Sequence, residues 1–119
     1  MRRLRIALAV AALLTAGAAQ AGARPIEGLW RVLPHGLCQA DGDRVPIRIT
    51  AERVEFYESA CTIAERAGLG VGAAERLVLS CAGEGEEWRR TLIALPGADG
   101  RLYLFSDDGA MAVHERCAE

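Results

Sequence analysis

Residues 61–81 read CTIAERAGLGVGAAERLVLSC. Two apolar arms, each carrying a cysteine, flank a glycine-rich centre that suits a chain reversal. Folding the segment about Val71 places three pairs opposite one another: Cys61 with Cys81, Ile63 with Leu79, and Glu65 with Leu77. This pattern predicts a β-hairpin whose two strands are joined by a disulfide.

The first 21 residues have the three parts of a secretory signal peptide. A positive segment with three arginines is followed by an apolar run over residues 6–14 and by the small-residue site Ala19-Gln-Ala21. The apolar run is too short to span a bilayer, which needs about 20 residues. We therefore expect cleavage after Ala21 and one domain over residues 22–119, located in the periplasm or secreted, with no membrane insertion after cleavage.

The charge of the expected mature chain disfavours two classes of partner. Loss of the leader arginines leaves 11 of the 14 basic residues with all 16 acidic residues, a net charge of about −5. A mildly acidic surface repels phosphate backbones and anionic headgroups. We expect neither nucleic acid nor anionic lipid as a partner.

The four cysteines predict two disulfides, because an even count in a small exported chain is typical of covalent cross-links. Zinc sites usually contain two cysteines within a few residues, whereas here the nearest cysteines are 20 apart. The hairpin favours Cys61–Cys81, which leaves Cys38–Cys117. The alternative pairing is Cys38–Cys61 with Cys81–Cys117. We expect no metal and no cofactor.

Short alternating segments separated by turn residues continue along the whole domain. Asp41-Gly42, residues 96–100 and Asp108-Gly109 are strong turn signals. The fold class that we predict is all-β: a small antiparallel meander of about 7–8 strands that forms a barrel or a strongly curved sheet. Besides the first arm of the hairpin, which begins at Cys61, the strands are expected at 29–33, 45–50, 53–59, 76–81, 88–95, 101–105 and 110–117.

One segment, residues 52–66, leaves two structures open. Val54, Tyr57, Cys61 and Ala64 are spaced as on one face of a helix. Val54 and Phe56 also alternate with polar residues as in a strand. We favour strand, because β-branched and aromatic residues gather here and no capping box precedes them.

The chain shows no constellation of catalytic residues, so we expect that it is not an enzyme. His35 and His114 are the only histidines, and no carboxylate motif accompanies either of them. We expect both on the surface, with His114 on the polar side of the last strand, opposite Met111 and Val113. No serine lies in a Gly-x-Ser-x-Gly motif.

The strongest candidate for a partner-binding site is the acidic loop with its aromatic neighbour. It contains Glu84, Glu86, Glu87 and Trp88, which together suit a basic protein surface. The structural interpretation, which we favour, is a turn followed by a core tryptophan, with the acids paired to arginines such as Arg89 and Arg90.

The motifs Gly28-x-Trp30, Tyr57-Glu-Ser-x-Cys61 and Cys81-x-Gly-Glu-Gly-x-x-Trp88, with the export signal, resemble small exported four-cysteine proteobacterial proteins of unassigned function. More loosely, the Gly-x-Trp opening resembles the small periplasmic β-barrel inhibitors of metalloproteases. That second resemblance implies an N-terminal segment that enters a protease cleft. The four cysteines depart from the inhibitors.

These observations favour a non-enzymatic exported binding module of the bacterial cell envelope. Its partner would be another envelope or secreted protein, or a small ligand. The alternative function is inhibition of a secreted hydrolase, of protease or lysozyme type, with Gly22–Glu27 or Glu84–Glu87 as the inserted segment.

Overall fold

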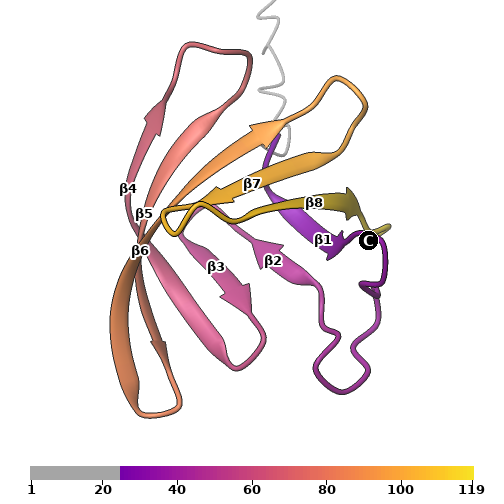
Figure 1. The fold of residues 1–119 in the computed structure, drawn as a ribbon, viewed down its shortest axis with the longest axis vertical. Helices are drawn as coiled ribbons and strands as arrows, with labels where there is room; N and C mark the ends of the chain where they lie inside the picture. The colour runs from indigo at the N-terminus through magenta and orange to yellow at the C-terminus, as the bar shows by residue number, and fades with distance from the viewer. Residues whose placement is uncertain (1–24) are drawn as a thin grey trace, which may run out of the picture.

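The computed structural model describes residues 25–119 as a closed barrel of eight antiparallel strands in simple sequence order (Figure 1). This confirms the predicted all-β meander, and of the two forms left open, a barrel or a strongly curved sheet, the structure is a barrel. The expected signal peptide, residues 1–21, lies outside the described residues. The strands are β1 (Gly28–Val32), β2 (Ile47–Ile49), β3 (Arg53–Phe56), β4 (Ser59–Gly68), β5 (Glu75–Gly83), β6 (Glu86–Pro96), β7 (Leu102–Ser106) and β8 (Met111–Arg116).

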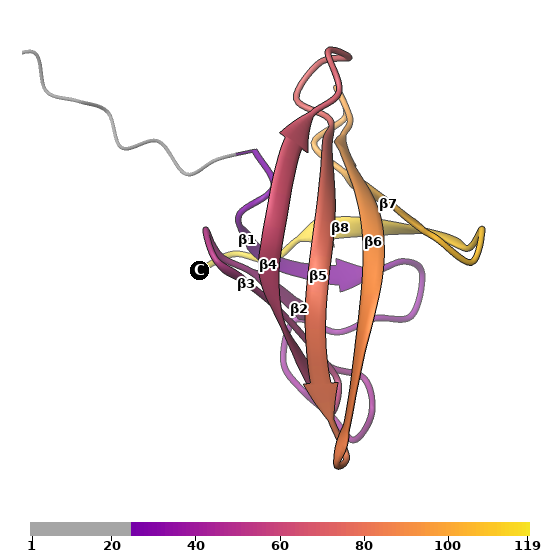
Figure 2. The ribbon, with the colours of Figure 1, turned by 90° about the vertical axis from the view of Figure 1, so that its left-hand side faces the viewer.

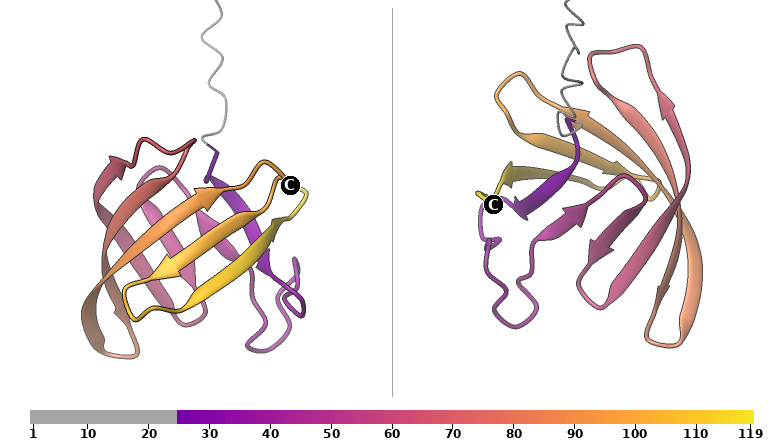
Figure 3. Two further views of the ribbon diagram at one scale, coloured as in Figure 1. Left: turned by 45° about the horizontal axis from the view of Figure 1, so that its top comes forward. Right: turned by 180° about the vertical axis from the view of Figure 1, so that it is seen from behind.

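The uncertain segment 52–66 forms strands, as favoured from its β-branched and aromatic content. β3 ends at Phe56, a two-residue turn follows, and β4 begins at Ser59. The strands of the barrel differ greatly in length. β4, β5 and β6 form one long wall, and β1 and β8 cross behind it at a steep angle (Figures 2 and 3). Pairing of β1 with β8 closes the sheet and removes its free edges.

The central hairpin has the predicted register up to a β-bulge. Cys61 lies opposite Cys81 and Ile63 opposite Leu79, as predicted. The pairing of Glu65 with Leu77 was wrong: the register shifts between Ile63 and Glu65, and Glu65 lies opposite Val78. The extra residue turns Glu65 away from the interior and places Arg66 opposite the fully buried Leu77.

Both predicted disulfides are present, Cys61–Cys81 and Cys38–Cys117. The first joins paired residues of β4 and β5 within the core. The second joins the loop after β1 to the residue after β8 across 79 positions. Two structural disulfides indicate an oxidising, extracytoplasmic environment. Across residues 25–119, no helix is long and apolar enough to cross a membrane.

One end of the barrel is filled by side chains, and we call it the closed end. Ile26, ahead of β1, is fully buried, and its carbonyl accepts a 3.0 Å hydrogen bond from the indole Nε1 of Trp30. Arg116 lies 4.1 Å from the Trp30 ring and donates to the carbonyls of Glu27 and Pro25. The segment that leads into β1 is therefore part of the barrel.

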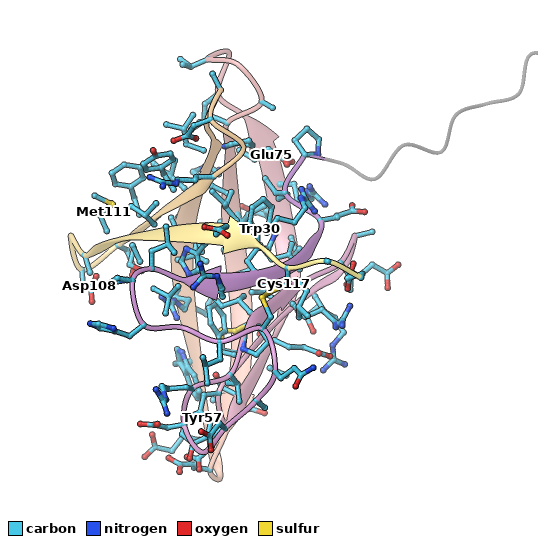
Figure 4. The ribbon with its side chains drawn as sticks, turned by 90° about the vertical axis from the view of Figure 1, so that its right-hand side faces the viewer. Trp30, Tyr57, Glu75, Asp108, Met111 and Cys117 are labelled. Carbon is cyan, nitrogen blue, oxygen red and sulfur yellow. A yellow bond between two sulfur atoms is a disulfide. The ribbon has the colours of Figure 1, made fainter. Side chains whose placement is uncertain are left out.

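An internal ion pair completes the closed end. The Arg66 Nε and Nη2 atoms lie 2.9 and 2.8 Å from the two carboxylate oxygens of Glu75, and Arg66 Nη1 lies 3.8 Å from Glu27. The pKa of Arg66 is raised, chiefly by the hydrogen bonds to Glu75. Figure 4 shows Glu75 near this end and Tyr57 at the opposite end of the molecule.

Two sequence-based assignments of the interior were wrong. His114 is buried, with 2% of its surface exposed, whereas Met111 on the same strand is 53% exposed. The last strand thus has the opposite phase, with its histidine inward. Trp88 is 38% exposed and is not a core residue, while Trp30 occupies the core at 1% exposure.

Candidate functional site

A pocket of about 200 Å³ lies inside the half of the barrel away from the closed end. The register explains its place, because its residues start β2 and β8, end β3 and β7, and lie in the first half of β6. Ten residues line it: Ile47, Phe56, Arg90, Leu92, Leu104, Ser106, Ala110, Met111, Ala112 and His114.

The pocket is apolar over most of its surface and is closed at its base. Leu92, Leu104 and His114 are almost fully buried, while Met111 is exposed and lies at the rim. In Figure 4, Met111 and Asp108 lie together at the side of the molecule, where β7 turns into β8. Small side chains at Ala110 and Ala112 leave space that larger residues would fill.

The buried imidazole of His114 is the least satisfied polar group in the pocket. Its Nδ1 atom has no hydrogen-bond partner among the described residues. Burial lowers the pKa of His114, against a smaller opposing effect of the neighbouring backbone at Leu102 and Ala112. The ring is therefore neutral at neutral pH, and Nδ1 remains available to a ligand.

Arg90 brings a positive charge to the pocket. Its Nη2 atom donates a 3.0 Å hydrogen bond to the Ser106 hydroxyl, and its guanidinium lies 4.8 Å from the centre of the Phe56 ring. Within residues 25–119, no carboxylate forms an ion pair with Arg90. The hydroxyl and the ring fix the guanidinium and leave several of its five N–H donors free for a bound molecule.

The hydroxyl of Ser106 is hydrogen-bonded to Arg90. Ser106 accepts a hydrogen bond from a guanidinium, which cannot remove its proton. A nucleophilic serine needs a neighbouring base, and Ser106 is hydrogen-bonded to Arg90 instead.

The predicted acidic site is divided by the structure. Glu84 and Gly85 form the two-residue turn between β5 and β6, both with positive φ, +49° and +79°. Glu86, Glu87 and Trp88 belong to β6 itself. Because side chains alternate along a strand, Glu86 and Trp88 share one face and Glu87 lies on the other.

Glu84 has a neighbour that the sequence did not suggest. It is hydrogen-bonded to Glu58 in the turn between β3 and β4, which raises the pKa of Glu84, while this bond and one from Tyr57 lower the pKa of Glu58. The two carboxyls therefore lie next to each other and interact. We call Tyr57, Glu58 and Glu84 the acidic tip.

One expectation about charged residues was wrong. Arg89 and Arg90 do not pair with the acids of this turn; within the described part of the chain neither forms an ion pair, and Arg90 lines the pocket. The lead-in of the alternative function, residues 22–27, is attached to the barrel at residues 25–27, since Ile26 is buried and Glu27 lies beside Arg66. Its insertion into a partner stays a prediction. Residues 22–24 lie outside the described range.

The pocket was not predicted from the sequence, although the alternation of apolar residues along β6 points to it. The buried residues Leu92 and Ala94 alternate along β6, and extending this alternation backwards places Arg90 inside. On β8, Ala112 and His114 alternate in the same way, and both face the interior. Of the two histidines, His35 is exposed as expected.

Comparison with protein-family models, with curated proteins and with solved structures finds no match to this chain.

Proposed function

We propose that this protein is a non-enzymatic exported binding module of the bacterial cell envelope, and that its barrel pocket takes a small ligand. The observation that supports this most is the buried, unpartnered Nδ1 of His114 in the lining of an otherwise apolar pocket. Buried polar atoms are nearly always hydrogen-bonded. A ligand that reaches this atom satisfies it and covers the surrounding apolar side chains.

The pocket volume limits the ligand to a small molecule. An apolar cavity of about 150 Å³ accommodates benzene. The pocket here, about 200 Å³, has room for one ring or a short chain with a few substituents. An oligosaccharide or a lipid with long acyl chains is too large for this pocket.

Filling the pocket tests this proposal. Ala112 lines the pocket, whereas Ala82 on β5 is exposed. We expect small aromatic probes to shift the amide resonances of pocket residues in the wild type and in Ala82→Phe, and to leave those of Ala112→Phe unchanged. Binding that survives Ala112→Phe, in a variant that remains folded, places the ligand elsewhere and contradicts the proposal.

Within the extracytoplasmic environment that the disulfides indicate, we propose that the protein is located in the periplasm or in the external medium. The disulfides support export, and the expected signal peptide is consistent with it. Cell fractionation with mass spectrometry of the mature N-terminus checks this, with cleavage expected after Ala21. An uncleaved cytoplasmic chain with free thiols overturns it.

The acidic tip favours a second candidate function, inhibition of a secreted hydrolase or binding of another envelope protein. Tyr57, Glu58 and Glu84 come together from two hairpin turns, and Tyr57 is 48% exposed. An exposed aromatic ring beside carboxylates suits a basic protein surface. Glu58→Gln with Glu84→Gln should weaken capture of such a partner and leave small-probe binding unchanged, and equal capture by wild type and variant contradicts this role.

A further inference from the structure

We infer that the ligand of the barrel pocket is a small organic carboxylate with an aromatic or short aliphatic body, and that Arg90 binds its negative charge. This inference rests on the proposed function and adds the chemical class of the ligand. It follows from a comparison of the arginines on the interior phase of their strands, from the charge of the lining and from the pocket size.

Among the residues that the structure describes, three arginines lie on the interior phase of their strands, and two of them have their donors occupied. Arg66 forms a two-point ion pair with Glu75, and Arg116 donates to two backbone carbonyls and stacks on Trp30. Arg90 differs. Its one hydrogen bond goes to a hydroxyl, Ser106 Oγ, and the remaining N–H groups have no acceptor among the described residues.

The lining of the pocket contains no acid that could neutralise Arg90. Apart from Arg90 and the neutral His114, all of the lining residues are uncharged. A fixed guanidinium with free donors matches a carboxylate in both charge and planar geometry. One guanidinium suits one negative charge, so the complementary ligand is a monoanion.

The other walls select the body of the ligand. Apolar contacts come from Phe56, Leu92 and Leu104. Met111 at the rim adds a flexible apolar side chain that can adapt to the shape of a ligand. A carboxylate and one ring fill a volume of about 200 Å³. His114 Nδ1 offers a second polar contact, which a hydroxyl or amine on the ring would use.

Benzoate and benzamide provide a matched test, because they have nearly the same shape and differ in charge. Affinities are measured by calorimetry and by amide shifts on the oxidised protein. We expect benzoate to bind about tenfold more tightly than benzamide, the effect of one charge-assisted hydrogen-bonded contact. Arg90→Gln should remove this preference. Arg89→Gln, next to it but exposed, should retain it.

The outcomes separate this inference from the proposed function. If both probes bind the pocket equally, the pocket binds ligands but the inference about charge is wrong. If neither probe shifts any amide resonance of the pocket residues, both the proposed function and the inference about charge are wrong. If Arg89→Gln lowers the affinity for benzoate as much as Arg90→Gln does, the preference for benzoate over benzamide comes from the overall charge of the protein. That result overturns the role of Arg90. Matching thermal unfolding curves confirm that the variants are folded.

Discussion

At the scale of single residues, His114 links the pocket to the stability of the barrel. In the unfolded chain its imidazole titrates near the ordinary histidine pKa of 6.5, whereas burial lowers the pKa in the folded state. Below about pH 6.5 the unfolded chain therefore binds a proton that the folded chain excludes. The contribution of neutral His114 to stability is complete above that pH and declines as the pH falls towards the folded-state pKa.

Replacing His114 should remove this part of the pH dependence. We expect the free energy of unfolding of the wild type to fall between about pH 7.5 and about pH 5.5, and that of His114→Gln to change less over the same range. Urea titrations at the two pH values measure the difference. His35→Gln, at an exposed position, should behave as the wild type does. Parallel pH profiles for wild type and His114→Gln would show that the buried imidazole does not titrate as argued.

At the scale of elements, the β-bulge in β4 decides which charge lies inside the barrel. Without the extra residue, Glu65 would face inward opposite Leu77; with it, Arg66 faces inward and meets Glu75. The bulge and the ion pair therefore support each other. The side chains of Arg66 and Glu75 are only 15% and 20% exposed, so solvent screens the pair weakly.

Breaking this pair should be costly. Arg66→Leu leaves Glu75 and Glu27 close together at the closed end without their shared counter-charge. We expect the free energy of unfolding to fall by about 2 kcal/mol, below the roughly 3–5 kcal/mol of a fully buried pair. The double variant Arg66→Leu with Glu75→Leu should recover part of the loss, as measured by denaturant unfolding. An additive loss in the double variant would contradict the coupling.

Close packing of two hairpin turns gives a second prediction for the elements. A Cβ atom at Gly83, the last residue of β5, would collide with the Glu58 carbonyl and with Ser59. Gly83→Ala should therefore lower stability by about 1–3 kcal/mol. Gly68→Ala, at the end of β4 with no atom near its added Cβ, is the matched control and should be neutral or slightly stabilising. Equal thermal unfolding temperatures for the two variants would exclude the predicted collision.

How far the sequence predicts these elements depends on whether the deciding contact is local. The hairpin and both disulfides follow from the alternation and spacing around Cys61 and Cys81. The bulge at Ala64 could not be predicted from the alternation of apolar and polar residues in β4. A single extra residue becomes apparent only when the strand is paired with β5. The phase of β8 was missed because His114 was classed as polar, although a neutral imidazole can be buried.

The pocket itself depends on contacts between distant parts of the chain. Phe56 and Arg90 come from strands that are not neighbours in the sheet, and barrel closure brings them together. Sequence spacing cannot show such a contact. The partner-binding role of Glu84, Glu86, Glu87 and Trp88 stays a prediction, now carried by Glu84 and its neighbours in the acidic tip.

At the scale of the whole molecule, the disulfide that reinforces closure and the proposed ligand pocket are located in different parts of the barrel. Cys38–Cys117 connects the loop after β1 to the chain end, beside the β1–β8 pairing that closes the sheet. Backbone hydrogen bonds reinforce this closure, from Leu33 N to the Val113 carbonyl and from Cys117 N to the Leu29 carbonyl, both 2.8 Å long. The lining residues of the pocket include none of these groups.

Removing this disulfide should therefore lower stability without removing the pocket. A closed loop of 79 residues corresponds to about 4 kcal/mol in the chain-entropy model, so Cys38→Ala with Cys117→Ala should shift the urea midpoint strongly. Below the new unfolding transition, the pocket amides should still respond to small aromatic probes with wild-type affinity, since β2, β3 and β6–β8 are unchanged in sequence. If the variant is folded but its pocket no longer responds, the disulfide also shapes the binding site, and the separation of the two functions within the barrel does not hold.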